Sequence, residues 1–484
     1  MTSRIAVRMA VLPLALFLAD CAVGPDYQRP DPVAPPAAHY KEVPGWTQAA
    51  PADAAPKGDW WTDFHDPLLD QLEPEVRVSN QTIQADYQNY QQALALVRVA
   101  NAGLYPTVGA TGSVTRSKSG SGGGSASSAG VSSGPSTQKE IEGTFSWDPD
   151  IWGKVRRTIE ENEATAQASE ATLANATLSA QVTLATTVIN LRVTDANIDI
   201  LDRTVTEYEE SLRVVSNAVR AGFTLYPPSN EMTARVQLEN ARASLIALGV
   251  TRAQYAHAIA VLVGKNPEDL DIPHNGTLPA LPEIPVGVPS TLLQRRPDIA
   301  AAERTMAAQN AAIGVAISAY YPDISLSAAV GLIALSQTSS TIWSLGATGT
   351  ETILDFGARA GQVAAAKAAY ESAVATYRGT VLSAFQSVEN DLAGLRILSQ
   401  EAAVLADAVK DSRRGAEIAR SEYQVGTVDY TTVATAQATA LTDEQTALGV
   451  QQTRLIDAAT LIGDLGGGWS DGQLHDAGAG FTLP

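Results

Sequence analysis

The sequence is poor in cysteine and in positive charge, and both shortages exclude classes of function. Cys21 is the single cysteine among 484 residues, so the chain cannot form an internal disulfide, a cysteine-rich zinc site or an iron–sulfur cluster. Lysine and arginine number 33 against 52 aspartates and glutamates, which gives a net charge of −19. Nucleic-acid binding needs basic side chains to neutralise phosphates, so this balance argues against a nucleic-acid partner.

The sequence also offers little to a catalytic site. Its five histidines are scattered, and no two of them stand at the spacing of metal ligands. No phosphate-binding G-x-x-x-x-G-K loop occurs, and the glycine cluster 122–124 lies in low-complexity sequence instead of between a strand and a helix. We therefore expect a protein that is not an enzyme and that holds no cofactor or metal.

Long hydrophobic runs are missing except for one near the N-terminus. Met9–Ala19 contains eleven residues, fewer than the ~20 that a membrane-spanning helix requires. Two arginines precede it, which is typical of a secretory signal peptide, here residues 1–20. A lone cysteine directly after such a core indicates a bacterial lipoprotein whose Cys21 thiol is lipidated. Ordinary cleavage near Cys21 is the alternative, because Asp20 stands where a small residue is usual.

Proline is absent from 150–226 and from 323–483, which permits very long helices. In the first gap the apolar residues recur at alternating steps of three and four, the period of supercoiled helices, with Asp195 as one polar break. The second gap repeats this pattern. The sequence predicts long helices over 153–221 and 357–425, each about 100 Å long at ~1.5 Å per residue.

Four segments of about ten residues alternate apolar with small polar residues, as tilted transmembrane strands do. They form two predicted hairpins, 105–148 and 321–355, and the Ser- and Gly-rich stretch 117–138 is expected to be the loop of the first. The apolar side chains would face lipid and the small polar ones a lumen, with Trp147 and Trp343 at the rims.

The same order of elements occurs twice, which indicates a tandem repeat. Gly153 and Gly357 are 204 positions apart, and so are Gly222 and Gly426. The predicted organisation is as follows: an extended anchor segment 21–67; a first repeat 68–263 with a helix, the hairpin 105–148, the long helix 153–221 and a helix 229–263; a Pro-rich connector 264–297; a second repeat 298–465 with a helix, the hairpin 321–355, the long helix 357–425 and a helix 430–465; and a tail 466–484. Four strands cannot close a barrel in lipid, so several identical chains must share one.

Several sequence blocks follow one another in a recognisable order. The segment starting at Cys21-Ala22-Val23-Gly24-Pro25 is followed by blocks at 60–69, 147–154 and 465–469. The most specific block, 288–299, contains Arg295, Arg296, Pro297 and Asp298. With these blocks in order, the chain resembles the outer-membrane factor lipoproteins of tripartite efflux systems, the TolC-like exit ducts.

The resemblance implies a mixed α+β membrane protein that assembles as a homotrimer. Each chain would give four strands to a twelve-stranded outer-membrane β-barrel and its long helices to a periplasmic α-barrel. The implied location is the outer membrane of a Gram-negative bacterium, with a lipid anchor and most of the mass in the periplasm. The implied partners are a periplasmic adaptor protein, an inner-membrane efflux transporter and outer-membrane lipid.

Function is expected to concentrate at the periplasmic tip, where related proteins close the duct by inward folding of helix pairs. The candidate residues for the gate and adaptor contact are Arg220, Gly222, Tyr226, Tyr423, Gly426, Asp429, Tyr430 and Thr435. The two glycines could instead merely end helices, a position that requires positive φ. Thr435 occupies a place where some relatives carry an acidic ring residue, so their gate chemistry need not apply here.

The function predicted from the sequence is passive conduction of small molecules, such as drugs, from a pump to the exterior. A TolC-like duct for protein secretion is the alternative with the same fold. A structural coiled-coil lipoprotein would explain the heptad pattern but not the four amphipathic strands.

Overall fold

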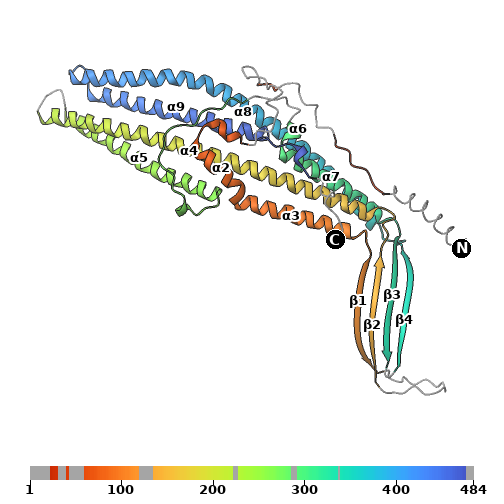
Figure 1. The fold of residues 1–484 in the computed structure, drawn as a ribbon. Helices are drawn as coiled ribbons and strands as arrows, with labels where there is room; N and C mark the ends of the chain where they lie inside the picture. The colour runs from red at the N-terminus through yellow and green to blue at the C-terminus, as the bar shows by residue number, and fades with distance from the viewer. Residues whose placement is uncertain are drawn as a thin grey trace, which may run out of the picture.

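The protein is an elongated bundle of helices that carries a four-stranded sheet at one end (Figure 1). The computed structural model describes residues 22–30, 40–42, 59–118, 135–221, 227–284, 292–335 and 338–475. The expected signal peptide 1–20, Cys21, Gly222, Tyr226, most of the loop 117–138 and the end of the tail lie outside the described residues. The expected combination of very long helices with four strands per chain is confirmed.

The elements occur in two series of matching order. The first series is α2 (Pro67–Ser79), α3 (Gln81–Ala102), β1 (Thr107–Ser117), β2 (Ser136–Trp147), α4 (Lys154–Arg220) and α5 (Pro228–Leu262). The second is α6 (Leu292–Arg295), α7 (Pro297–Ser318), β3 (Asp323–Leu335), β4 (Thr338–Thr350), α8 (Ala358–Gln424) and α9 (Tyr430–Asp464). Short 3₁₀ helices lie outside these series: η2 (Trp60–Phe64), η3 (Pro267–Asp269) and η5 (Asp471–Gln473).

After the first helix of each series, corresponding helices have equal lengths. Helices α3 and α7 both have 22 residues, α4 and α8 both have 67, and α5 and α9 both have 35. Gln81 and Pro297 are 216 positions apart, Lys154 and Ala358 are 204 apart, and Pro228 and Tyr430 are 202 apart. From α3 and α7 onward, the offset between the repeats therefore changes at the hairpin loop and at the turn between the paired helices.

The first helix predicted after the anchor segment, about 68–103, is in fact two helices. Asn80 ends α2 and caps α3: its φ and ψ of −66° and 124° are extended, and its Oδ1 accepts from the N–H of Thr82 at 2.9 Å. Its Nδ2 donates to the carbonyl of Leu262 at 2.9 Å. An asparagine side chain satisfies the free donors of a helix start well, which explains the break.

The four strands form one antiparallel sheet in the order β1-β2-β3-β4. Residues directly opposite one another in the register share a face of the sheet. Val108 is paired with Phe145, which is paired with Ala328, which is paired with Leu345. This row and its neighbours two residues away are apolar on all four strands, and Val108 and Leu345 are 81% and 80% exposed. On β1, β2 and β4 the opposite face carries mainly threonine, serine and glutamate, and on β3 it changes from Asp323, Ser325 and Ser327 to small and apolar residues farther along the strand.

The expectation of a tryptophan at each rim of the sheet is half right. Trp147 is the last residue of β2, and its indole Nε1 donates to the carbonyl of Leu104 at 3.0 Å, where the sheet meets the helices. Trp343 is instead the sixth of the 13 residues of β4, lies opposite Val330 and is 79% exposed. The sequence could not place Trp343, because the end of β4 had to be guessed from composition.

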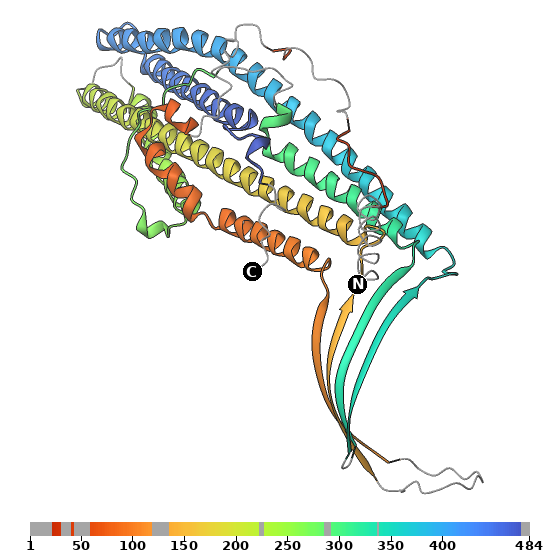
Figure 2. The ribbon, with the colours of Figure 1, turned by 45° about the vertical axis from the view of Figure 1, so that its right-hand side comes forward.

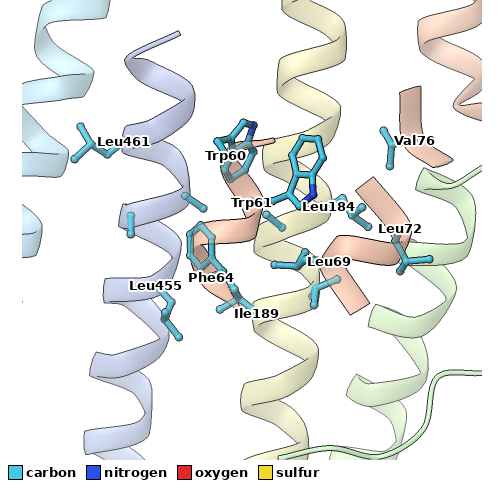
Figure 3. Close-up of a cluster of buried hydrophobic side chains, with 14 of the residues drawn as sticks. Trp60, Trp61, Phe64, Leu69, Leu72, Val76, Leu184, Ile189, Leu455 and Leu461 are labelled. Atoms are coloured by element: carbon cyan, nitrogen blue, oxygen red, sulfur yellow. The ribbon is translucent and has the colours of Figure 1, made fainter. Parts of the chain in front are cut away.

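The main hydrophobic core lies midway along the helices, where η2 and α2 pack against α4 and α9 (Figure 3). Trp60 makes edge-to-face contacts with Trp61 and Phe64, with ring centroids 6.1 and 6.2 Å apart. Leu69 and Leu72 are fully buried in the same cluster. The anchor segment thus clamps the middle of the bundle through large apolar side chains.

Asp195, the polar break in the heptad pattern of α4, is a buried anchor. Its side chain is fully buried, and its Oδ1 accepts from Arg252 Nε of α5 at 2.7 Å. Its Oδ2 accepts from the backbone N–H of Asn275 in the connector at 2.9 Å. A buried carboxylate is tolerated when charge and hydrogen bonds compensate it. Asp195 therefore fixes α5 and the connector against α4.

Helix α5 is long and apolar enough, by length and composition, to cross a membrane. Only 11% of that apolar window is buried, and the structure packs α5 along α4. Exposed ion pairs join the two helices, as between Arg242 and Glu209 at 2.7 Å. The exposed apolar side chains of α5, such as Ile246 at 75%, form a surface that another chain can cover.

Candidate functional site at the helix tips

At the end of the bundle far from the sheet, the end of α4 and the start of α5 lie near the turn that joins α8 to α9 (Figures 1 and 2). Tyr423 and Tyr430 face each other there with ring centroids 5.6 Å apart at an interplanar angle of 67°. Both are buried, with exposures of 4% and 1%, in a cluster that includes Val215 of α4 and Ala234 of α5. The aromatic pair thus joins both helix pairs.

Gly426 shapes the turn between α8 and α9. Its φ is +78°, its N–H donates to the carbonyl of Tyr423, and the N–H of Thr427 donates to the carbonyl of Glu422, both at 3.0 Å. This is the Schellman arrangement that ends helices at a residue with positive φ. The geometry supports a capping role for Gly426, which the sequence offered as the alternative to a role in the gate.

Asp429 and Tyr430 bind side chains of the other helix pair. Asp429 Oδ1 accepts from Asn230 Nδ2 at 2.9 Å, and its Oδ2 accepts from Thr431 Oγ1 at 2.8 Å. These bonds, with Thr431 the larger contributor, lower the pKa of Asp429 below its usual value. Tyr430 donates through its hydroxyl to Gln237 Oε1 at 3.3 Å, and burial raises the pKa of Tyr430 to about 12.

Two candidates predicted from the sequence lie apart from this cluster. Arg220 is exposed in the last turn of α4, where its charge interacts favourably with the helix dipole. Thr435 is exposed, and its hydroxyl donates to the carbonyl of Thr431 at 2.8 Å within its own helix. The structure therefore brings together Tyr423, Asp429 and Tyr430, with Gly426 shaping the turn.

The partners on the first helix pair were missed in the sequence. They are Asn230, Gln237 and Ser211, and Ser211 Oγ lies 3.3 Å from Gln437 Nε2 of α9. Ser211 and Asn230 are buried polar residues that alternate with buried apolar residues of their own helices, Tyr208 and Val215 in α4 and Ala234 and Leu238 in α5. That mismatch is a sequence signal for these two residues, whereas Gln237 carries no such signal.

A charged groove lies next to the tip between α4, α8 and α9. Glu444 of α9 binds Arg413 of α8 at 2.5 Å and lies 3.6 Å from Arg203 of α4. The hydrogen bond to Glu444 is the main cause of the raised pKa of Arg413. The groove thus adds ion pairs between the two helix pairs, nearer to the sheet than the aromatic cluster.

The Arg-Arg-Pro-Asp block lies far from the tip, at the junction of connector, α7 and α9. Arg296 binds Asp298 at 2.7 Å and Asp464 at 2.9 Å, while Pro297 starts α7. Gly466 has a φ of +99°, and a Cβ there would come within 2.2 Å of the carbonyl oxygen of Arg295. The block therefore fastens the second repeat to the end of α9.

A strap formed by residues 22–30 lies where sheet and helices meet. The N–H of Val23 donates to the carbonyl of Trp152 at 3.0 Å. Arg157 is 5% exposed and binds the strap through Asp26 Oδ1 at 2.7 Å and the carbonyl of Gly24 at 3.3 Å. The chain is thus held beside the base of the sheet from Val23, two residues after Cys21.

Among the described residues, no group of three or more His, Cys, Asp or Glu side chains could hold a metal ion. What the tip contains is a polar and aromatic contact between two helix pairs, an arrangement suited to holding them together or letting them part.

Comparison with known proteins places these features in a family. The model of a family described as outer membrane efflux protein matches residues 72–265 and 288–467, one segment for each repeat. The antibiotic efflux pump outer membrane protein ArpC of Pseudomonas putida is 31% identical over 470 residues, covering 94% of both chains. The toluene efflux pump outer membrane protein TtgC, also of Pseudomonas putida, is 30% identical over 467 residues, again covering 94% of both chains. The solved outer-membrane channel OprN superposes with a TM-score of 0.83 at 27% identity, covering 93% of this chain and all of that one.

Proposed function

Because the chain belongs to the outer membrane efflux protein family, we propose that it is the exit duct of a tripartite efflux pump. It is an outer-membrane efflux channel, and it conducts passively while an inner-membrane transporter supplies the energy and a periplasmic adaptor docks at the tips. The observation that carries this function is the sheet, with an exposed apolar face on all four strands and a polar face behind it.

The assembly is a homotrimer. Strands β1 and β4 are each paired on one side only, and unpaired strand edges are not stable within a bilayer. Three chains supply twelve strands, which close a barrel with the apolar face toward lipid and the threonines and serines toward the lumen. The exposed apolar residues of α5 support the same contact between chains in the periplasm.

The cargo is a small organic molecule. The relatives' names specify antibiotics and toluene, and this chain covers 94% of the length of each. Selection of the cargo lies with the pump, because the described residues of the tip form no enclosed binding site. A secretion duct for proteins is the alternative, and the relatives' names favour small molecules.

Cys21 is lipidated. The strap after it is bound at the base of the sheet through Val23 and Arg157, so a lipid on Cys21 reaches the membrane leaflet that the strands enter. The test is the native mass of protein extracted in mild detergent. We expect a trimer of chains that start at Cys21, each heavier by a glycerol and three acyl chains. Trimers with unmodified N-termini refute the lipid anchor, and a folded monomer refutes the shared barrel.

The gate is the contact between the two helix pairs at the tip. Opening separates α8 and α9 from α4 and α5, which breaks the bonds of Asp429 to Asn230 and of Tyr430 to Gln237. Each such bond contributes about 1 kcal/mol, and that free energy changes an open-to-closed ratio about fivefold.

Removing these bonds is expected to open the tip. Asp429→Ala and Tyr430→Phe each remove a bond to the other helix pair, and Tyr430→Phe keeps the buried ring. Each should raise the open fraction of single channels in a planar bilayer about fivefold. Thr435→Ala is the matched control, because its hydroxyl bonds only within α9, and it should conduct like the unmodified protein. If Asp429→Ala and Tyr430→Phe conduct like Thr435→Ala, the tip bonds serve only to shape the turn.

A further inference from the structure

The two open edges of the sheet, β1 and β4, are the least explained part of the molecule. The trimer of the proposed function, on which this inference rests, requires them to meet but does not say in which register. We propose that β4 pairs antiparallel with β1 of the partner subunit so that Thr348 lies opposite Ser113 of the partner subunit. The same seam brings Phe356 against Tyr105 of the partner subunit.

The repeat offsets predict strand register within the chain. β1 and α3 precede the hairpin loop and map onto the second repeat by adding 216, whereas β2 and α4 follow it and map by adding 204. Ser113 of β1 is opposite Glu140 of β2. By the two offsets, Ser113 corresponds to Ala329 and Glu140 corresponds to Ser344. Ala329 and Ser344 are opposite one another in β3 and β4. The offsets therefore carry a register from one repeat to the other without error.

The same offsets, applied to the pairing of β2 with β3 between the two repeats, give the pairing of β4 with β1 of the partner subunit. Thr144 of β2 lies opposite Ala329 of β3. Adding 204 to Thr144 gives Thr348 of β4, and subtracting 216 from Ala329 gives Ser113 of β1. The contact of β2 with β3 inside one chain thus predicts that of β4 with β1 across two chains.

The sheet faces agree with this register. Ser113 and Thr348 both lie on the polar face, and the neighbouring pair, Gly112 with Gly349, lies on the apolar face. A slip of one residue would place apolar side chains of one chain beside polar ones of the next. The alternation therefore excludes odd slips, and the repeat offsets decide among the even ones.

An aromatic contact at the base of the sheet supports the same seam. Between the repeats, Trp152 stacks on Tyr321 with ring centroids 4.9 Å apart, and its Nε1 donates to the carbonyl of Pro322 at 2.8 Å. By the same offsets, Trp152 corresponds to Phe356 and Tyr321 corresponds to Tyr105. Phe356 is 93% exposed in the single chain, and Tyr105 is 44% exposed.

The turn that carries Phe356 is firmly built. Arg359 binds Asp355 at 2.7 Å and Glu351 at 2.8 Å, and its guanidinium lies 5.2 Å from the ring centroid of Tyr320. These bonds hold a phenylalanine, with a φ of +52°, out in solvent. The backbone at Phe356 differs from that at Trp152. We therefore expect the ring contact between chains as well, but not the same angle between the two rings. A second copy of the chain is the occupant that covers the ring.

Disulfide trapping tests the register in the full-length protein. Ser113→Cys with Thr348→Cys should form intermolecular disulfides under mild oxidation and give a covalent trimer on a non-reducing gel. The controls move one cysteine by two residues on the same polar face: Thr111→Cys or Thr115→Cys, each with Thr348→Cys. Their Cα atoms would lie about 7–8 Å apart, beyond the ~7 Å limit for a disulfide. Single-cysteine variants report any linkage through Cys21.

Each outcome decides the register separately from the trimer. Stronger linkage of a control pair overturns the register, and so does the absence of linkage in protein whose native mass is that of a trimer. A monomeric native mass without cross-linking contradicts the proposed trimer itself.

The aromatic contact has its own test. Phe356→Ala should lower the temperature at which the trimer dissociates in detergent. Phe356→Trp should keep or raise it, because an indole can donate to the carbonyl of Pro106 of the partner subunit, as Trp152 does to Pro322. An unchanged dissociation temperature for Phe356→Ala overturns the ring contact.

Discussion

Arg192→Met should destabilise the protein more than any other single substitution considered for the helical body. Arg192 Nε donates to Asp66 Oδ2 at 2.8 Å, and Arg192 Nη2 donates to Asp66 Oδ1 at 3.1 Å. The side chains are only 5% and 4% exposed. Removing one partner of a buried ion pair leaves the other charge buried, which costs about 3–5 kcal/mol. Asp66 also caps α2, so the loss loosens the anchor segment from the middle of α4.

Thermal unfolding followed by circular dichroism measures this effect. Arg213→Met is the matched control, since Arg213 is on the same helix but pairs with Glu210 in solvent, where ion pairs contribute about 0–1 kcal/mol. The double variant Asp66→Asn with Arg192→Met should recover part of the loss, because asparagine keeps the cap without the charge. If Arg192→Met melts like Arg213→Met, the buried pair does not fasten the anchor segment.

One buried carboxyl group, that of Glu73, is expected to make the protein less stable as the pH rises. Glu73 of α2 is fully buried, and among the described residues neither of its carboxyl oxygens has a hydrogen-bond partner. Burial raises the pKa of Glu73 to about 9, whereas an unfolded glutamate titrates near ~4.3. The folded protein therefore keeps a proton that the unfolded chain releases over this range. The folded state loses up to ~1.4 kcal/mol per pH unit between the two values.

Glu73→Gln removes this titration and keeps the shape of the side chain. The variant and the unmodified protein should melt at similar temperatures near pH 5, and the variant should be the more stable by a margin that grows toward pH 8. Asp70→Asn, which changes an exposed carboxylate one turn earlier on the same helix, is the control and should leave the pH profile unchanged. A constant difference between Glu73→Gln and the unmodified protein across this range would contradict the buried, protonated state.

The long helices and the repeat could be predicted because their signals extend over dozens of residues. A period of 3.5 sustained along 153–221 leaves few alternative structures, and two glycine pairs with the same spacing gave the offset of 204 between the long helices. The break at Asn80 could not be predicted, since a single capping side chain decides it. Its effect depends on the contact with Leu262, far away in the sequence.

The tip was located from the sequence, but its bonds were not. Tyr423, Asp429 and Tyr430 stand near a turn marked by Gly426, so a local signal existed for the second helix pair. Their partners Asn230 and Gln237 lie about 200 residues away. Only the packing of α4 and α5 beside α8 and α9 brings them together. A contact between residues so far apart in the chain leaves no local pattern in a single sequence.

The equal helix lengths of the two repeats constrain how such a duct can evolve. A single residue inserted into α4 would turn everything beyond it by about 100° and advance it by about 1.5 Å, which destroys the packing that α4 shares with its neighbours. Insertion of seven residues preserves the heptad phase but lengthens one wall by about 10 Å unless α5, α8 and α9 lengthen with it. Relatives that bridge a wider periplasm should therefore carry paired insertions in multiples of seven, at matching depths in both repeats.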